Sequence, residues 1–235
     1  MSLYRMEYRL LDADVDRDRR LRWSRLFAMF EQASLAHFSQ LGAGADQTQP
    51  RGLCWIIALQ RADIRRLPEY GEQITLSSWS GKTAYMLFPR YYRMHDQTGA
   101  LLLEGSALWG LMDAKTRTLA FPQQHGISVP AHLTGDDPPL PRTLRGVEPT
   151  ERHRFRVPYS YLDLNGHMNN TRYFDLVQDL LPPEALRAMP RSIRIEYCAE
   201  ARWRDELTVG AVKTGTGWFF RGDTDRRIFC MALEY

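Results

Sequence analysis

The segment DLNGHMNNTRY, residues 163–173, gathers the side chains of this chain that are best able to do chemistry. A carboxylate, an amide and an imidazole stand at alternate positions and two more amides follow: Asp163, Asn165, His167, Asn169 and Asn170. Asp, Asn and Thr before a helix are also ordinary caps, each worth about 1 kcal/mol. Because this polar set exceeds what one helix start requires, we weigh an active site against capping alone.

Motifs of several other enzyme classes are absent from the sequence. It contains no GxSxG elbow, no HExxH pair and no P-loop, which argues against a serine hydrolase, a zinc protease and a P-loop NTPase. What remains is acid–base work on a bound water, with the N–H groups of a helix start stabilising an oxyanion. Thioester hydrolysis suits an acid–base group beside an oxyanion site, because a thiolate is a good leaving group and needs little activation.

The polar segment precedes one of two helical patterns, and strand-like runs follow each pattern. Apolar residues recur at helical spacing from Trp23 to Leu41 and again from Tyr173 to Leu180, before two prolines. The strand-like runs are CWIIALQRADI, QITLSSWS, YMLFPRYYRM and LLLEGSALWGLMD after the first, and SIRIEYCA, ELTVGAV, WFFRG and RRIFCMALEY after the second. This order predicts an α+β fold in which two antiparallel sheets each wrap a helix.

A proline-rich stretch separates the two halves. It predicts an N-terminal domain over residues 1–130, a linker over 131–152 and a C-terminal domain over 153–235.

The halves align loosely, with DRDRRLRWS falling on NGHMNNTRY. This alignment places Asp18 opposite His167 and Leu67 opposite Glu200, so the first half lacks the polar set of the second. We therefore expect one catalytic centre per chain, and a first half free to hold a substrate tail.

Composition narrows the class of protein. The 235 residues are 44% hydrophobic, enough for a large core, and no apolar run approaches the roughly 18 residues of a membrane helix. The first residues lack the apolar stretch of a signal peptide, so we expect a cytoplasmic protein. Cys54, Cys198 and Cys230 have neither CxxC nor metal-ligand spacing, so we expect free, mostly buried thiols, no metal and no cofactor.

The basic residues are nearly all arginine, although the net charge is only +3. They cluster within residues 17–25, 61–66 and 202–204. One interpretation is a set of solvated faces balanced by Asp and Glu. The other is a docking surface for an acidic partner, because guanidinium groups suit phosphate and carboxylate. A net charge of +3 does not require a nucleic-acid partner.

Several motifs together resemble the acyl-ACP thioesterases of plants and bacteria, a family with a tandem (double) hotdog fold. DLNGHMNNTRY resembles the family's D-x-N-x-H-x-N-N motif, and IRIEYCAEARWRDEL resembles its L-E-Y-R-R-E-C segment. In the first half, SALWGLMDAKTRTLAFP resembles S-x-W-x-M-M-x-x-x-T-R-x-L-x-x-x-P. The resemblance covers nearly the whole chain and implies two sheets that each wrap a central helix.

The resemblance implies a set of catalytic positions: Asp163, Asn165, His167 and Glu200. The family's cysteine after the glutamate falls on Ala201, so a cysteine nucleophile is impossible there. We therefore expect direct hydrolysis, in which Glu200 and Asn165 position and activate a water. His167, oriented by Asp163, would handle protons. Whether Glu200 or His167 is the general base stays open.

Two structural expectations accompany this mechanism. Backbone N–H groups around Asn169 and Asn170 should contribute to the oxyanion site. In a regular strand Glu200 lies on the same side as Arg194, opposite Ile193, so it needs a bulge or the interface between the halves to reach His167.

The resemblance also implies a substrate and a partner. The chain would hydrolyse fatty acyl-acyl carrier protein, release free fatty acid and end chain elongation in fatty acid biosynthesis. Its partner would be an acyl carrier protein that presents the acyl group on a phosphopantetheine arm. This carrier protein would bind to the arginine clusters. The acyl chain is expected in the first half, between tunnel walls that include Met29, Phe30, Ala33, Trp55 and Ile57.

Other functions stay open at this point. An acyl-CoA thioesterase would use the same fold and chemistry. A hotdog hydratase or dehydratase also uses Asp and His, but Asn165 and Glu200 argue against it. A non-catalytic acyl-binding hotdog protein is the remaining class. Chain length and saturation are undecided, and a monomer and a homodimer both fit.

Overall fold

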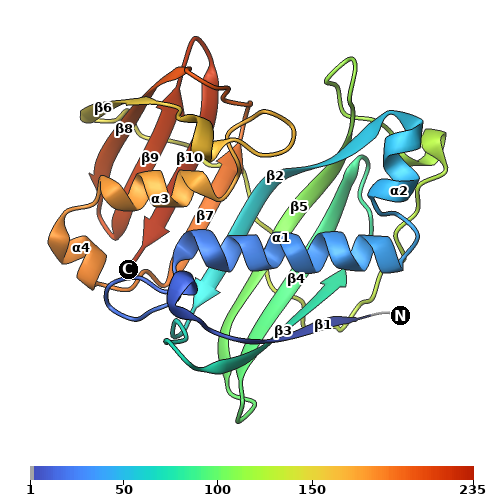
Figure 1. Ribbon diagram of the computed structural model, residues 1–235, viewed down its shortest axis with the longest axis horizontal. Coiled ribbons are helices and arrows are strands. Elements are labelled where there is room, and N and C mark those ends of the chain that lie inside the picture. Colours follow the sequence, from blue (N-terminus) through green and yellow to red (C-terminus); the bar gives the residue numbers. More distant parts are fainter. Residues whose placement is uncertain (1–2) are drawn as a thin grey trace. The chain divides into compact units, whose positions relative to one another are not determined.

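The protein is described by a computed structural model over residues 3–235, and the chain forms two compact units. The first ends at Pro141 and the second begins at Arg142, so the boundary falls inside the proline-rich stretch. Each unit consists of one antiparallel sheet with a helix across it (Figure 1).

The first unit begins with strand β1 and helix α1, and four long strands follow. Its elements are β1 (Tyr4–Arg9), α1 (Trp23–Gln40), α2 (Ala45–Thr48), β2 (Leu53–Ile64), β3 (Gln73–Ser80), β4 (Leu87–Asp96) and β5 (Leu101–Asp113). The strands lie in the order β1-β3-β4-β5-β2, and all neighbours are antiparallel. The core of this unit includes one buried face of α1, formed by Leu26, Phe27, Met29, Phe30, Ala33 and Phe38.

The second unit repeats this plan with shorter elements. They are β6 (Glu151–Arg156), α3 (Arg172–Asp179), α4 (Pro183–Arg187), β7 (Ser192–Tyr197), β8 (Glu206–Thr214), β9 (Gly217–Asp223) and β10 (Arg227–Glu234). The strand order is β6-β8-β9-β10-β7, again antiparallel throughout. Strand for strand this is the order of the first unit, so the predicted α+β class with a doubled plan is confirmed.

The sequence did not predict two of the strands, β1 and β6. Every second residue of β1 is exposed, and nearly all of β6 is exposed, so neither contains a continuous apolar run. Each lies at the end of its unit's strand order, where polar residues are common. Their sequences therefore lack the pattern by which the other eight strands were recognised.

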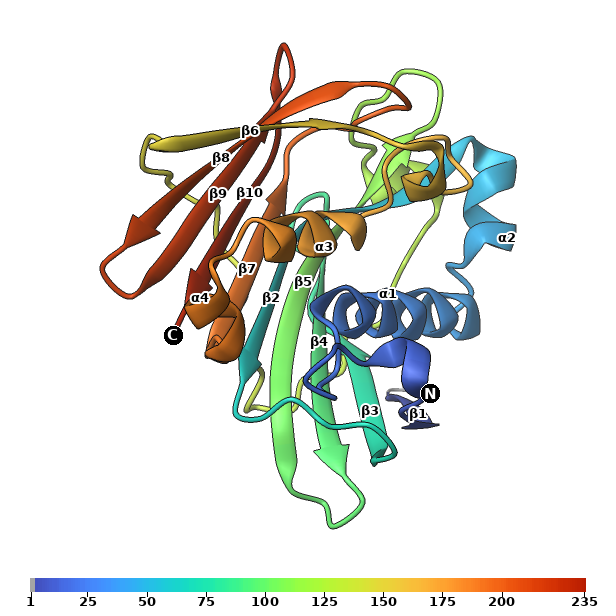
Figure 2. The ribbon, with the colours of Figure 1, turned by 60° about the vertical axis from the view of Figure 1, so that its left-hand side comes forward.

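The two central helices differ in length for a simple reason. Helix α1 runs for 18 residues, whereas α3 ends after 8, just before Pro182 and Pro183. A proline inside a helix lacks the N–H that the helix needs and clashes with the preceding turn. The chain resumes as the short helix α4, which is visible beside α3 in Figure 2.

The proline-rich stretch makes hydrogen bonds to strand residues of each unit. In the first unit the indole of Trp79 donates to Asp137 at 2.6 Å, and the N–H of His132 donates to the carbonyl of Ser80. In the second unit the N–H of Leu144 donates to Glu196 at 2.7 Å. In the second unit Leu144 of this stretch also packs against the buried cluster of Val212, Phe219 and Cys230.

Candidate active site

Residues 163–167 form a tight turn that brings His167 to the start of α3. The carboxylate of Asp163 accepts the backbone N–H of Asn165 at 2.8 Å and that of His167 at 3.3 Å. The N–H of Asp163 donates in return to the carbonyl of His167 at 2.9 Å. Gly166 has φ +77°, a left-handed conformation that glycine adopts without steric cost. The acceptor at Asp163 and the left-handed conformation of Gly166 therefore define this turn.

Glu200 reaches His167 because the chain leaves the regular strand before it. Strand β7 ends at Tyr197, and the N–H groups of Cys198 and Ala199 both donate to the carbonyl of Ile228. This double contact breaks the alternation of side chains, which is the irregularity expected from the sequence. Glu200 Oε2 then lies 3.1 Å from His167 Nε2.

The His167–Glu200 pair is suited to proton transfer. The His167 side chain is 16% exposed and that of Glu200 is 31% exposed, so both are partly desolvated and still accessible. At 3.1 Å the imidazole nitrogen and the carboxylate oxygen lie within hydrogen-bonding distance of each other. Either residue is therefore placed to accept a proton and return it.

The side chains of Asp163 and Asn165 face each other within the turn. The amide of Asn165 donates to Asp163 at 3.4 Å, and Asn165 is exposed. A role for Asn165 in positioning water together with Glu200 remains a proposal. Asp163 binds the backbone of His167, so its described role is to hold the turn.

The helix start corrects one expectation about the oxyanion site. The N–H of Asn169 donates to the carbonyl of Tyr161 at 2.8 Å, so it is not free to bind an oxyanion. The side-chain oxygen of Asn169 accepts from the N–H and the hydroxyl of Thr171. Asn169 is thus a structural residue of the helix start, and the proposed oxyanion donor becomes the N–H of Asn170.

Tyr173 is a functional candidate that the sequence did not reveal, because its helical spacing marked it as core. Its ring is buried and packs against Phe229, with ring centroids 4.8 Å apart. Burial raises the pKa of the Tyr173 phenol, while a hydrogen bond with the backbone of Ala201 opposes this rise. Tyr173 therefore fixes the residue that directly follows Glu200.

The first unit contains the same turn. Asp16 accepts the N–H of Asp18 at 2.9 Å and that of Arg20 at 3.0 Å, and its own N–H donates to the carbonyl of Arg20. Arg19 takes the left-handed place of Gly166, with φ +65°.

This correspondence corrects the sequence alignment of the two halves. The residue opposite His167 is Arg20 rather than Asp18, a shift of two positions. Leu67 does stand opposite Glu200, because Leu21 donates to Pro68 as Met168 donates to Ala201. In the first unit Asp18 stands opposite Asn165 and Arg20 stands opposite His167. These two residues form an ion pair at 3.2 Å. This unit therefore has the turn but not the imidazole–carboxylate pair.

The proposed acyl-chain walls lie in the packed interior of the first unit. Met29, Phe30, Ala33 and Ile57 are buried. The ring of Phe30 stacks on Tyr92 at 4.1 Å, and that of Trp55 stacks on Phe38 at 4.0 Å. Their role as tunnel walls stays a prediction.

Other expectations concern thiols, metals and membranes. Cys54, Cys198 and Cys230 are free, as expected, but the expectation of mostly buried thiols was wrong: of these three, Cys230 is buried, Cys54 is partly exposed and Cys198 is exposed. Its thiol hydrogen-bonds to that of Cys230, which raises the pKa of Cys198.

Within residues 3–235, no group of three or more His, Cys, Asp or Glu side chains is arranged to hold a metal ion. None of the described helices has the length and apolar character needed to cross a bilayer.

Comparison with known protein families decides the relationship. Residues 1–122 match the acyl-ACP thioesterase N-terminal domain, and residues 145–219 match the acyl-ACP thioesterase C-terminal domain. The chain belongs to the acyl-ACP thioesterase family.

Solved structures in this family share the fold. An acyl-ACP thioesterase from Bacteroides thetaiotaomicron is 19% identical and superposes with a TM-score of 0.86, over 99% of this chain and 97% of that one. The 12:0-ACP thioesterase from Umbellularia californica is 20% identical, with a TM-score of 0.80 over 99% of this chain and 96% of that one. The tandem hotdog architecture is thereby confirmed.

The curated relatives of this acyl-ACP thioesterase family member are plant proteins. A palmitoyl-acyl carrier protein thioesterase from Cuphea hookeriana is 24% identical over 84% of this chain and 52% of its own length. A dodecanoyl-acyl carrier protein hydrolase from Cinnamomum camphora is 22% identical over 98% of this chain and 63% of its own length. The chain thus spans about half to two thirds of the length of these relatives.

Proposed function

We propose that this chain hydrolyses the thioester of fatty acyl-acyl carrier protein and releases free fatty acid. The observation that carries the proposal is the 3.1 Å contact between His167 Nε2 and Glu200 Oε2 beside the start of α3. Membership of the family supports the choice of substrate, and so do the names of the relatives. The reaction would end chain elongation in fatty acid biosynthesis.

The proposed reaction needs only water and the residues already described. The water oxygen attacks the thioester carbon, and its proton passes to the His167–Glu200 pair. The oxyanion that forms is stabilised by the N–H of Asn170 and the positive end of α3. When the C–S bond breaks, the thiolate takes the proton back from the pair, which leaves a fatty acid and a free thiol.

The surface beside the pair suits an acidic protein partner. Arg202 and Arg204 are exposed on the loop that follows Glu200, and Arg202 bridges to His167 through the backbone. Leu164 is 92% exposed on the catalytic turn itself. A rim that is both basic and apolar offers charge attraction and a hydrophobic contact. We propose that acyl carrier protein docks on this rim.

The test is a direct assay of thiol release from a panel of acyl-acyl carrier proteins and matching acyl-CoAs. Wild type should hydrolyse the carrier-protein substrates, and His167→Ala should lower the rate at least 10²-fold with the fold intact. A clear preference for CoA would move the assignment to an acyl-CoA thioesterase. No hydrolysis of any substrate by folded wild type would contradict the proposal in favour of a non-catalytic acyl-binding protein. The cytoplasmic location stays a prediction.

A further inference from the structure

Two cysteines lie on the same face of the second sheet, at the end of strand β7. Tyr197 of β7 pairs with Phe229 of β10, and the rings of both pack against Tyr173 of α3. Cys198 and Cys230 each directly follow one of these paired residues, so their side chains point to the opposite face of the sheet. There the two thiols share a hydrogen bond.

The two thiols differ in their access to solvent. Cys198 is exposed, whereas Cys230 is 1% exposed and packs with Val212 and Phe219. The S–H of Cys198 donates to Cys230, which raises the pKa of Cys198 and lowers that of Cys230. A proton that moves along this hydrogen bond lets either sulfur carry the thiolate, the form that reacts. The pair therefore combines an accessible sulfur with a second sulfur directly behind it, as in cysteine pairs that undergo oxidation.

The backbone at Cys198 also positions the carboxylate of the candidate active site. The N–H groups of Cys198 and Ala199 donate to the carbonyl of Ile228 at 2.8 Å and 3.1 Å. Two residues that share one acceptor in this way form a β-bulge, which changes the direction of the side chains that follow. Glu200 is the next residue, and its Oε2 lies 3.1 Å from His167 Nε2. The position of Glu200 therefore depends on the bulge that begins at Cys198.

A disulfide between these sulfurs needs a closer approach than a regular ladder provides. Cys230 is paired with Glu196, so Cys198 lies diagonally across the ladder from it. Diagonal Cα atoms in an antiparallel pair are about 7–8 Å apart, whereas those of a disulfide are about 4.4–6.8 Å apart. Part of the backbone must therefore move when the bond forms.

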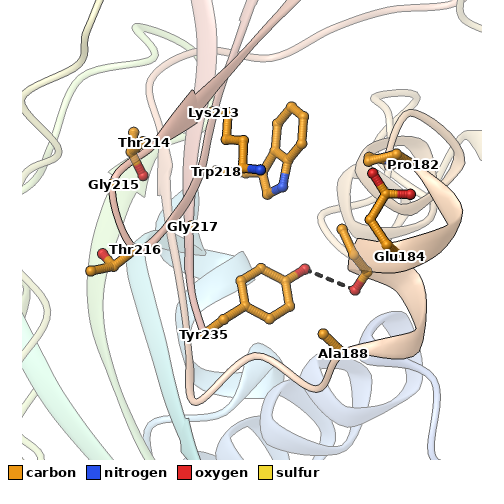
Figure 3. A pocket seen from close by; sticks show the side chains of 11 residues that line it. Pro182, Glu184, Ala188, Lys213, Thr214, Gly215, Thr216, Gly217, Trp218 and Tyr235 are labelled. Carbon is orange, nitrogen blue, oxygen red and sulfur yellow. Dashed lines mark hydrogen bonds between the residues drawn. The ribbon is translucent and has the colours of Figure 1, made fainter.

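Strand β10, which contains Cys230, is the less movable partner. It pairs with β7 on one side and with β9 on the other. The residue after it is tied to α4, because the hydroxyl of Tyr235 donates to the carbonyl of Ala185 at 3.2 Å, beside a cavity of about 450 Å³ (Figure 3). Cys198 lies just beyond the end of β7. Closing the bond should therefore draw Cys198 and its bulge toward Cys230 and displace Glu200.

We propose that Cys198 and Cys230 form a reversible disulfide, which displaces Glu200 from His167 and lowers the rate of hydrolysis. The co-reactant is a low-molecular-weight disulfide, for which oxidised glutathione is the probe. The effect on the rate rests on the proposed thioesterase function, whereas formation of the bond does not.

The bond forms by two thiol–disulfide exchanges. The Cys198 thiolate attacks one sulfur of oxidised glutathione, whose S–S bond breaks, and one glutathione thiolate leaves. The Cys230 thiolate then attacks the Cys198 sulfur and displaces the second glutathione thiolate. The two cysteine thiols are oxidised to one disulfide, and oxidised glutathione is reduced to two thiols, which take up the two protons that the cysteines release.

The first measurement detects the bond. Purified protein is treated with oxidised glutathione and analysed by mass spectrometry with and without dithiothreitol. Wild type should lose two hydrogens, and proteolysis should yield two peptides linked through Cys198 and Cys230. Cys230→Ala lacks the second sulfur and should instead retain one glutathione on Cys198. A glutathione that persists on Cys198 of wild type would overturn the proposal.

The second measurement connects the bond to the candidate active site. On one acyl-acyl carrier protein, kcat/KM of wild type should fall at least tenfold after oxidation and return with dithiothreitol. A displacement of about 1 Å at a reacting group can cost about 10²-fold. Cys198→Ser should match reduced wild type within twofold and should not respond to oxidised glutathione. The control is Cys54→Ser, because the Cys54 thiol lies in the first unit and donates to the carbonyl of Met112. It should respond to oxidation as wild type does.

A third measurement does not need activity. The NMR signals of the His167 imidazole should shift when the bond forms in wild type and should stay unchanged in Cys198→Ser. A bond that changes neither kcat/KM nor these signals would overturn its control of Glu200. If reduced wild type hydrolyses no substrate, the proposed function is contradicted, while mass spectrometry and NMR still decide whether the bond forms and displaces Glu200 from His167.

Discussion

The carboxylate of Asp163 accepts the backbone N–H of His167 at 3.3 Å. Asp16 accepts the N–H of Arg20 at 3.0 Å in the same way, within a turn that has no imidazole. The aspartate at this place thus holds the same turn in both units, with or without the imidazole–carboxylate pair. The chemistry that distinguishes the second unit therefore lies in His167 and Glu200.

This comparison predicts how aspartate variants behave. Asp163→Asn keeps an oxygen acceptor for both N–H groups, so activity should fall less than tenfold. Asp163→Ala and Asp16→Ala should each lose about 1 kcal/mol of unfolding free energy, as for a lost cap. Denaturant unfolding and hydrolysis rates measure both effects. A loss of 10²-fold or more in a folded Asp163→Asn protein would show that the charge of Asp163 acts on the imidazole.

A second prediction concerns Tyr173, whose phenol bonds to the backbone of Ala201. Tyr173→Phe should cost about 1 kcal/mol of stability, the usual value of one hydrogen bond. If the phenol positions Glu200, kcat should also fall about tenfold while KM stays unchanged. Steady-state kinetics separate the two parameters. A stability loss with wild-type kcat would leave Tyr173 as an ordinary core residue.

The motif and the helix start were accessible from sequence because both are local. Asp163, Asn165 and His167 stand within five residues of each other, and the backbone of the turn follows from Gly166 and the acceptor at Asp163. The position of Glu200 was not accessible, because it depends on the double contact of Cys198 and Ala199 with Ile228. Sequence spacing alone identified the need for an irregularity, not its form.

The register between the halves shows a similar limit. Sequence placed Asp18 opposite His167, whereas the hydrogen bonds of the two turns place Arg20 there. Few side chains in the two turns are shared, so only the backbone pattern reveals the match.

A third prediction concerns alkaline pH. Burial raises the pKa of Tyr92 to about 12, whereas an unfolded tyrosine has a pKa near 10. The folded state therefore keeps a proton that the unfolded state releases, so stability falls as pH rises from about 10 to 12. The loss attributable to Tyr92 is about 2–3 kcal/mol. Tyr92→Phe should be less stable at neutral pH but should lose less between pH 9 and 11.5.

Denaturant unfolding at each pH tests this prediction. The matched control is Tyr85→Phe, because Tyr85 is 84% exposed and its hydroxyl meets water in both states. The control should follow the wild-type pH dependence. An identical dependence in wild type and Tyr92→Phe would assign the alkaline loss to other residues.

A fourth prediction concerns the proposed docking rim. Arg202→Glu should lower kcat/KM for acyl-acyl carrier protein about tenfold and leave that for the matching acyl-CoA within twofold. Added salt should weaken the wild-type reaction with carrier protein and reduce the effect of the variant, because exposed charges are screened. The control is Arg187→Glu, an equal charge change on α4. Equal losses in both arginine variants would indicate a general charge effect rather than a docking site.

The most direct test of the account compares Glu200→Gln with Arg20→Ala under single-turnover conditions on one acyl-acyl carrier protein. Glu200→Gln keeps the size of the side chain but removes the proton acceptor 3.1 Å from His167. It should lower the hydrolysis rate at least 10²-fold, the usual contribution of a general acid–base group. Arg20→Ala changes the counterpart of His167 in the other unit and should alter the rate less than threefold. A Glu200→Gln protein with nearly full activity, or an equal loss in both variants, would contradict a single catalytic centre at His167–Glu200.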